Sequence, residues 1–278
     1  MPAVFKYCDA RGLEILTNLE IKVTPPNQFN DPFEFMANIA CSNPNQWAYR
    51  YFNEDRIREL HTSGVMEGRF TDSFPKFLKR FKANRQKFIK GWITDVWPNA
   101  IKNTQANVLD DISECLGVLC LSRKETSILM WGHYCDSHRG MVIGFDDSNE
   151  MFKRASGLRP VNYEEKRVEF DMTAARSSEE TRALNERIIF TKNREWSYEE
   201  EVRQVFHLRD LRKDKLCNGK DGYFCPIPPE AIVCVYLGTK CRDETKTKVR
   251  KALDAPQLSR VQLREGSLHD SEFRLGFE

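Results

Sequence analysis

The sequence predicts an α+β fold, in which a largely antiparallel sheet carries a helix-rich insertion. Strand-like apolar runs occur near both ends of the chain, whereas residues 44–116 have the apolar spacing of helices. The order of elements is mixed and does not alternate regularly between strand and helix, which disfavours a parallel sheet. We therefore expect one domain over residues 1–278, with the helical insertion at about 44–116.

The first elements lie before and within this insertion. A strand is expected at "AVFKYC", residues 3–8, and a short helix and a second strand within residues 10–26. The second strand ends at the Pro25-Pro26 pair. Inside the insertion, helical patterns cover residues 51–64, 72–97 and 106–117.

The second half of the chain is richer in strands. A buried strand at 117–123 precedes a helix at 125–138, which Thr126 or Ser127 caps. The elements expected after it are strands at 139–146 and 159–170, a charged helix at 172–193, strands at 197–208 and 230–238, a surface helix at 241–253 and a strand-like end at 259–277.

Composition narrows the class of protein. The 43 basic and 41 acidic residues nearly cancel, so any basic surface must be local. No signal-peptide-like start and no run of about 18 apolar residues occurs, so we expect a cytoplasmic protein that does not enter a membrane. The nine cysteines include no CxxC pair, and we expect neither a disulfide framework nor a bound metal. Walker, GxGxxG, HExxH and GxSxG motifs are also absent.

The densest group of candidate site residues is "CLSRKETSILMWGHY". Ser122 ends the buried strand, and Ser127, Trp131 and Tyr134 follow at i, i+4 and i+7, on one face of the helix. One interpretation is that Trp131 and Tyr134 pack the helix onto the sheet. The other is that Tyr134 stacks on a flat ligand while the two serine hydroxyls bind a sugar or phosphate.

A second group is the acidic run in "WSYEEEVR". In a strand, Glu199 and Glu201 point to one face and Glu200 to the other. Two carboxylates on one face repel each other unless a cation or a hydroxyl-rich ligand lies between them, as in a site that stabilises a cationic transition state. The alternative is a solvated strand start beside Arg194 and Arg203.

A third group combines Tyr7 of the first strand with "FNDPFE", residues 29–34. Asn30, Asp31 and Glu34 are able to hydrogen-bond a ligand, but Asn30 and Asp31 are equally typical of an Asx-turn before Pro32.

A fourth group is basic. Residues 75–92 contain seven cations and no acid, interleaved with an apolar stripe at helical spacing: Lys76, Lys79, Arg80, Lys82, Arg85, Lys87 and Lys90. The stretch is either an amphipathic helix with a solvated face or a surface for a polyanion such as nucleic acid.

Several of these segments resemble a bacterial family, the domain of unknown function 2971. The resemblance rests on "FKYC", "FNDPFE", "CLSRKETSILMWGHYCDSHRGMVIGFD", "WSYEEEVR" and "PPEAIVCVYLG", and it spans the chain except residues 44–110. More distantly, the order of these segments is similar to that of the ADP-ribosyltransferase fold, which splits a mainly antiparallel sheet around a cleft for NAD.

That resemblance implies an NAD-dependent transferase. Glu201 would stabilise the cationic ribose and Glu199 would deprotonate the acceptor. Tyr7 stands where many relatives have His or Arg, and Tyr134 would stack on nicotinamide. The residues implied to contact NAD are Tyr7, Asn30, Asp31, Ser122, Ser127, Trp131 and Tyr134. Related bacterial transferases often act as toxins or in phage defence, which implies an antitoxin protein as a partner, and the basic stretch favours nucleic acid as the acceptor.

Three alternatives remain open from the residues. The protein is an NAD glycohydrolase that uses water as the acceptor, an inactive fold that binds nucleic acid through its basic stretch, or a nuclease with Asp31, Glu34, Glu199 and Glu201 as magnesium ligands.

Overall fold

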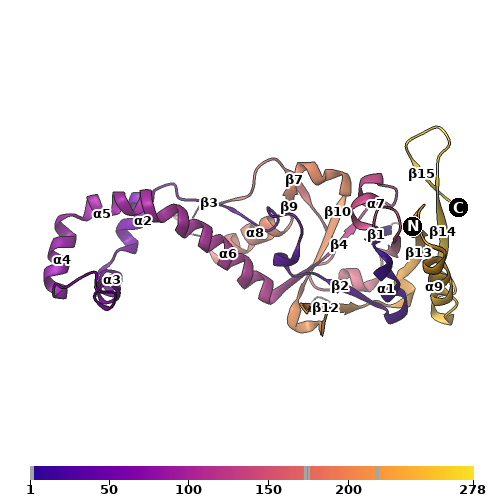
Figure 1. Cartoon of the computed structure of the whole chain (residues 1–278), viewed down its shortest axis with the longest axis horizontal. Coiled ribbons are helices and arrows are strands. Elements are labelled where there is room, and N and C mark those ends of the chain that lie inside the picture. The colour runs from indigo at the N-terminus through magenta and orange to yellow at the C-terminus, as the bar shows by residue number, and fades with distance from the viewer. Residues whose placement is uncertain (1–2, 172–173, 175, 217–218) are drawn as a thin grey trace. The chain divides into compact units, whose positions relative to one another are not determined.

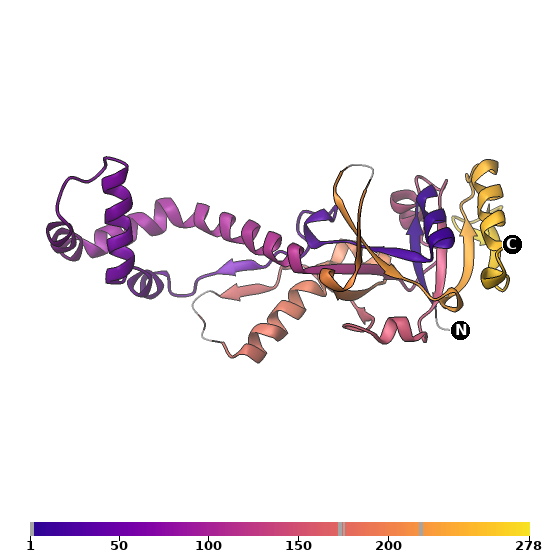
Figure 2. The same cartoon turned by 90° about the horizontal axis from the view of Figure 1, so that it is seen from below.

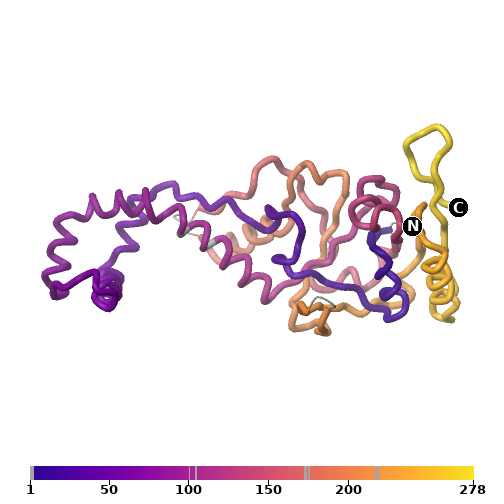
Figure 3. The backbone as a smooth tube through the Cα atoms, in the orientation of Figure 1, coloured from indigo at the N-terminus to yellow at the C-terminus, as the bar shows by residue number. Residues whose placement is uncertain are grey.

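The computed structural model describes residues 3–171, 174, 176–216 and 219–278. The chain divides into two compact units, which are traced in Figure 3. Unit 1 contains Met1–Phe35, Leu109–Arg167 and Ile189–Glu278, and unit 2 contains Met36–Val108 and Val168–Ile188.

An eight-stranded sheet forms the centre of unit 1, in the order β15-β14-β13-β5-β1-β4-β10-β6 (Figure 1). All of its neighbouring strands are antiparallel except β13 and β14. The described residues therefore confirm a mixed helix-and-strand fold with a large, mainly antiparallel sheet. The strands are β1 Ala3–Cys8, β4 Leu116–Ser122, β5 Met141–Asp146, β6 Arg159–Pro160, β10 Glu201–His207, β13 Ile232–Leu237, β14 Gln262–Leu268 and β15 Leu275–Phe277.

The sheet is split between two of its central strands. β1 pairs with β5 along its whole length, from Ala3 to Cys8, but with β4 it has a single register pair, Phe5 with Ser122. The other end of β4 is reached by an isolated bridge between Thr24 and Val118. The middle of β4 therefore has no strand partner on the β1 side among the described residues.

Alternation along the strands gives the sheet two apolar faces. Val4 of β1 packs with Ile143 and Leu119 on one face, whereas Phe5 and Tyr7 face the opposite core. The core on the side of Phe5 and Tyr7 is aromatic and contains Trp131, Tyr236 and Phe277.

Shorter elements surround the large sheet. α1 Leu13–Asn18 packs against α9 Asp243–Leu253, and the two helices lie together at one end of unit 1 (Figures 1 and 2). The other elements are α7 Ile128–Tyr134, a three-stranded sheet of β11 Arg212–Lys215, β12 Asp221–Pro226 and β2 Glu20–Val23, a parallel pair of β7 Asn162–Glu164 and β9 Thr191–Asn193, and the 3₁₀ helices η1 Ala10–Gly12, η2 Pro26–Gln28, η4 Glu150–Lys153, η5 Arg194–Glu199, η6 Leu208–Asp210, η7 Pro229–Ala231 and η8 Pro256–Leu258.

Unit 2 is mostly helical and has its own aromatic core. Phe52, Phe77, Phe81 and Ile89 are buried in it, and Trp47 and Trp92 stack at its side with ring centroids 5.5 Å apart. Its elements are α2 Pro44–Tyr51, α3 Glu54–Met66, α4 Phe74–Ala83, α5 Arg85–Gly91, the π-helix η3 Trp92–Val96, most of α6 Trp97–Cys115, α8 Ser178–Ile189, and the parallel strands β3 Asn38–Ala40 and β8 Glu169–Asp171.

Four expectations from the sequence need correction. The run at 159–170 forms three short strands with different partners, not one strand, because Pro160 cannot continue a central ladder and pairs only at the sheet edge. The helix expected at 172–193 ends at Ile189 and is followed by β9, and residues 172, 173 and 175 lie outside the described part. The pattern at 72–97 is interrupted at Asn84, whose backbone is not helical (φ −113°, ψ 17°). The β11–β12 hairpin was not expected at all.

Among the described residues, no helix has the length and apolar character needed to cross a membrane.

Candidate functional site

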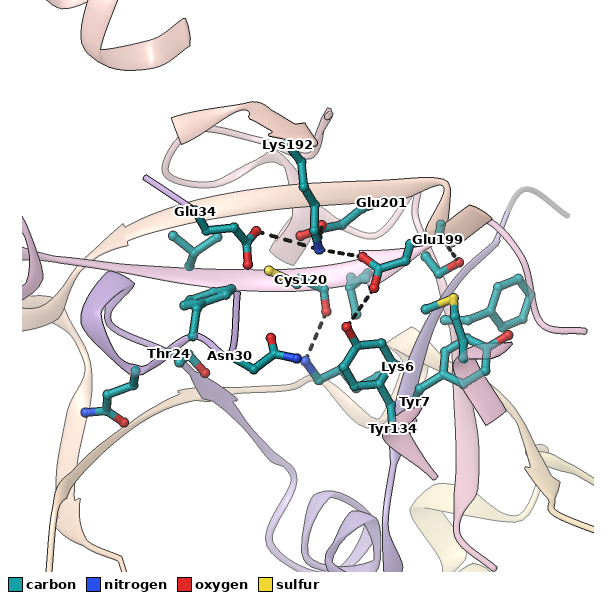
Figure 4. Close-up of a pocket in the computed structure, with 17 residues that line it drawn as sticks. Lys6, Tyr7, Thr24, Asn30, Glu34, Cys120, Tyr134, Lys192, Glu199 and Glu201 are labelled. Atoms are coloured by element: carbon teal, nitrogen blue, oxygen red, sulfur yellow. Dashed lines mark hydrogen bonds and ion pairs between the residues drawn. The ribbon is translucent and has the colours of Figure 1, made fainter. Parts of the chain in front are cut away.

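A pocket of about 250 Å³ opens in unit 1 where β1 and β4 separate (Figure 4). One wall is the "FNDPFE" loop, another is α7, and a third is the stretch from β9 to the start of β10. The polar side chains that line it are Lys6, Tyr7, Thr24, Gln28, Asn30, Glu34, Cys120, Ser122, Tyr134, Lys192, Glu199 and Glu201.

Three carboxylates converge on one ammonium group at this pocket. Lys192 Nζ donates to Glu199 Oε2 at 2.6 Å and to Glu201 Oε2 at 2.9 Å, and lies 3.6 Å from Glu34 Oε1. All four side chains are at most 5 % exposed. Bulk water therefore screens these charges little, and their interactions are strong.

Arg203 supports the same cluster from the far side of Glu201. Its Nε donates to Glu201 Oε1 at 2.7 Å, its Nη2 donates to Glu34 Oε1, and its Nη1 donates to the Ile189 carbonyl at 2.6 Å. The guanidinium also lies over the Phe35 ring. Both oxygens of Glu201 are thus held by cations, whereas Glu34 Oε2 is buried without a hydrogen-bond partner among the described residues.

The cluster separates the acidities of its carboxyl groups. Burial would raise the pKa of Glu201, but Arg203 and Lys192 outweigh it and lower that pKa to about 2. Burial raises the pKa of Glu199, which Lys192 opposes only in part, and burial likewise raises the pKa of Glu34. Glu201 is therefore a fixed anion, and a proton taken up by the cluster goes to Glu199 or Glu34.

Glu199 is the carboxylate that the pocket's hydroxyl groups reach. Tyr134 OH donates to Glu199 Oε1 at 2.7 Å, and Ser122 Oγ donates to the Glu199 backbone carbonyl at 2.6 Å. Burial raises the pKa of Tyr134, and the adjacent Glu199 raises it further, so the phenol stays protonated and remains a donor. An incoming hydroxyl is able to take the place of the phenol on Glu199.

The two predicted carboxylates meet, but not for the reason that the sequence suggested. Glu199 is the last residue of η5, and β10 begins at Glu201, so the two are not alternate residues of one strand. Glu200 between them is left-handed (φ 44°, ψ 48°) and points away, where it pairs with Lys124. The turn at Glu200, not strand alternation, aims both side chains at Lys192.

The other predicted ligand-binding residues divide into two sets. Tyr7, Asn30, Ser122 and Tyr134 line the pocket. Trp131 is fully buried, and its Nε1 donates to the Glu125 carbonyl at 2.9 Å, so it packs α7 onto the sheet.

Ser127 and Asp31 also have local structural partners. Ser127 is the N-cap of α7 and accepts from Met130 N at 3.4 Å, and Asp31 closes its own turn by accepting from Phe33 N at 2.9 Å. The "FNDPFE" segment is therefore both a turn and a pocket wall, and its Glu34 carries the wall's charge.

Four basic side chains of unit 2 remain exposed, and three others have partners. Lys76 and Arg80 pair with Asp72, at 3.1 and 2.6 Å, and Arg85 donates to the carbonyls of Tyr49 and Phe52. The exposed set is Lys79, Lys82, Lys87 and Lys90, on α4 and α5.

Sequence reasoning missed the cations of the cluster. Arg203 had a readable signal, because it is two residues after Glu201 in a strand and so shares its face. Lys192 had none, since its segment has the pattern of a helix end and its strand pairing with β7 depends on distant residues.

The position of Lys192 bears on the nuclease alternative. Glu34, Glu199 and Glu201 do converge, but the point at which a magnesium ion would bind is filled by the Lys192 ammonium, and Asp31 faces its own turn. These carboxylates already have a cation, so the residues present do not fit a metal site.

Comparison with known proteins gives a family for part of the chain. Residues 130–204 match a family model described as "Protein of unknown function (DUF2971)". No curated protein and no solved structure matches the chain. The matched segment runs from α7 into β10 and contains Tyr134, Lys192, Glu199, Glu201 and Arg203. The family expected from the sequence is confirmed: through residues 130–204, which hold most of the charged cluster, the chain belongs to the DUF2971 family.

Proposed function

We propose that this protein is an NAD-dependent ADP-ribosyltransferase, a toxin or phage-defence effector that transfers ADP-ribose to nucleic acid. The observation that carries the proposal is the Glu199 carboxylate, which is buried beside a split sheet and shared between the Tyr134 hydroxyl and Lys192. A buried carboxylate with an exchangeable hydroxyl partner suits the recognition of a ribose hydroxyl and the stabilisation of positive charge on the sugar.

Within this proposal, Glu199 is the carboxylate that contacts the ribose. Both oxygens of Glu201 are already held by Arg203 and Lys192, so a ligand would have to displace a buried ion pair to reach them. Glu199 exchanges only a phenol. Glu201 then acts indirectly, by fixing Lys192 and through it Glu199. This reverses the emphasis that the resemblance implies, in which Glu201 is the principal acid.

The reaction transfers a glycosyl group. The bond between ribose C1′ and the nicotinamide nitrogen breaks, and its electron pair leaves with nicotinamide. An oxygen or nitrogen of the acceptor then bonds to C1′ and loses a proton. Glu199 is suited to receive that proton, because burial raises its pKa above that of an ordinary carboxyl group.

Nucleic acid is proposed as the acceptor because of the exposed lysines of unit 2. Lys79, Lys82, Lys87 and Lys90 are exposed and have no ion pair with an acidic residue among the described residues, whereas Lys76 and Arg80 are neutralised by Asp72. Free ammonium groups supply sequence-independent contacts to phosphates.

The test uses NAD labelled on its adenosine half. Wild-type protein, Glu199→Gln and Glu201→Gln are incubated with RNA, DNA or a cell lysate in separate tubes, and the folding of each variant is checked by thermal unfolding. Label on one acceptor, lost in folded Glu199→Gln, would support the transferase.

Two other results would redirect the proposal. Free nicotinamide and ADP-ribose with no labelled acceptor would favour a glycohydrolase that uses water. Intact NAD with folded wild-type protein in every tube would refute the proposal and leave an inactive nucleic-acid-binding fold ahead.

A further inference from the structure

Lys6 is a pocket cation whose hydrogen-bonding capacity is mostly unused. It lies on β1 between Phe5 and Tyr7, and its Nζ donates to the Cys120 carbonyl at 3.0 Å, across the gap where β1 and β4 separate. An ammonium group has three donors. No carboxylate forms an ion pair with Lys6 among the described residues. Figure 4 shows its amino group beside Asn30, on the opposite side of the pocket from Lys192 and Glu201.

A second positive charge lies close to Lys6 without relief. Lys22 of β2 is half-buried, and its pKa is lowered, first by that burial and then by the positive charge of Lys6. Like charges in a partly buried setting repel, and an anion bound nearby would remove that cost. The pocket is thus polarised, since Lys6 and Lys22 lie at one side and three carboxylates with two cations lie at the other.

We propose that Lys6 binds a phosphate of the pocket's ligand, at the side of the pocket away from the carboxylates. The inference rests on the proposed function, in which that phosphate belongs to the pyrophosphate of NAD. A volume of about 250 Å³ is near the lower limit of small-molecule sites. It holds a ring and a sugar, so the pyrophosphate lies where the pocket opens and Lys6 is placed to meet it.

Binding of three ligands to four forms of the full chain tests this. The ligands are ADP-ribose, ADP and the uncharged adenosine, and the proteins are wild type, Lys6→Met, Lys6→Arg and Lys22→Met. Because a charge-assisted hydrogen bond is lost, we expect Lys6→Met to weaken ADP-ribose and ADP by about tenfold or more and to leave adenosine unchanged. Lys6→Arg should keep most of the affinity. Lys22→Met, whose side chain does not line the pocket, should have a smaller effect.

Three outcomes would overturn the inference. They are equal weakening of adenosine and ADP-ribose by Lys6→Met, the same loss in Lys22→Met as in Lys6→Met, or no binding of ADP or ADP-ribose by folded wild-type protein. Lys6→Met also leaves the Cys120 carbonyl without its donor, so thermal unfolding is measured for every form and Lys6→Arg serves if Lys6→Met does not fold.

Failure of the proposed function would give a different pattern. ADP-ribose bound through Lys6 by a protein that never cleaves NAD would uphold the phosphate site and refute the transferase. NAD cleavage with an unchanged KM in Lys6→Met would do the reverse.

Discussion

Replacing Lys192 by methionine should destabilise the fold strongly and make its stability depend on pH. Lys192 Nζ lies 2.6, 2.9 and 3.6 Å from oxygens of Glu199, Glu201 and Glu34, and methionine has nearly its length without its charge. At an effective dielectric constant of about 20, unit charges about 4 Å apart attract by about 4 kcal/mol. The cost of dehydrating the ammonium offsets part of this, and removing one partner of a buried ion pair costs about 3–5 kcal/mol net.

The sign of the pH effect follows from the carboxyl groups left behind. Burial already raises the pKa of Glu199 and Glu34, and losing Lys192 raises both further. A carboxyl group with a raised pKa in the folded state favours folding when protonated, and that contribution is lost as the pH rises through the raised pKa. The variant should therefore be more stable at about pH 5 than at about pH 7, by more than wild type is.

Urea unfolding at both pH values measures this, with Lys192→Met/Glu199→Gln as a matched variant. Removing one carboxylate restores the charge balance, so the double variant should regain about 1–3 kcal/mol at neutral pH. A loss below about 1 kcal/mol in Lys192→Met, with no difference between the two pH values, would refute the reading of the cluster as a charge-balanced unit.

The remaining predictions concern two tyrosines, the fixed carboxylate and the exposed lysines. Tyr134→Phe and Tyr163→Phe should each cost about 1–3 kcal/mol, because one leaves Glu199 Oε1 without its donor and the other leaves Glu201 N without its acceptor, but only Tyr134→Phe should slow nicotinamide release. Equal effects of the two on release would contradict the assignment of Tyr134 to the pocket. Wild type should lose stability as the pH falls from the ordinary Glu pKa of 4.5 towards about 2, because Glu201 is held ionised, and Glu201→Gln should lack that slope. Replacing the exposed lysines by Gln should reduce the salt dependence of nucleic-acid binding by about 0.9 per phosphate contact, with Lys76→Gln/Arg80→Gln as the control pair; a control as weak as the quadruple variant would contradict the division between paired and free cations. The exposed lysines are Lys79, Lys82, Lys87 and Lys90.

Local sequence signals predicted much of the fold. The apolar run that ends at Ser122 is a buried strand, and the serine before the α7 pattern is its N-cap, because both depend on neighbours a few residues away. The segment at 159–170 could not be resolved in this way. Its three short strands pair with β10, β9 and β3, so their limits depend on distant partners rather than on their own periodicity.

The candidate site was predictable only in outline. Tyr134 and Glu199 were found because polar residues that cluster beside buried strands are unusual. The cations that give the acids their properties were not found, since the position of Lys192 depends on the pairing of β9 with β7. The left-handed Glu200 is a further example. A single backbone turn brings Glu199 and Glu201 together, and a residue without an obvious preference for that conformation gives no warning of it.

The most direct test of the account is the release of nicotinamide from NAD by wild type, Glu199→Gln and Glu201→Gln, measured beside their unfolding temperatures. The account predicts that wild type releases nicotinamide and that Glu199→Gln is folded and at least about a hundredfold slower. Glu201→Gln should mainly lose stability, because its carboxylate is held by Arg203 and Lys192. Nicotinamide release by Glu199→Gln at the wild-type rate, or no release by folded wild-type protein, would contradict the central claim that Glu199 contacts the ribose of NAD.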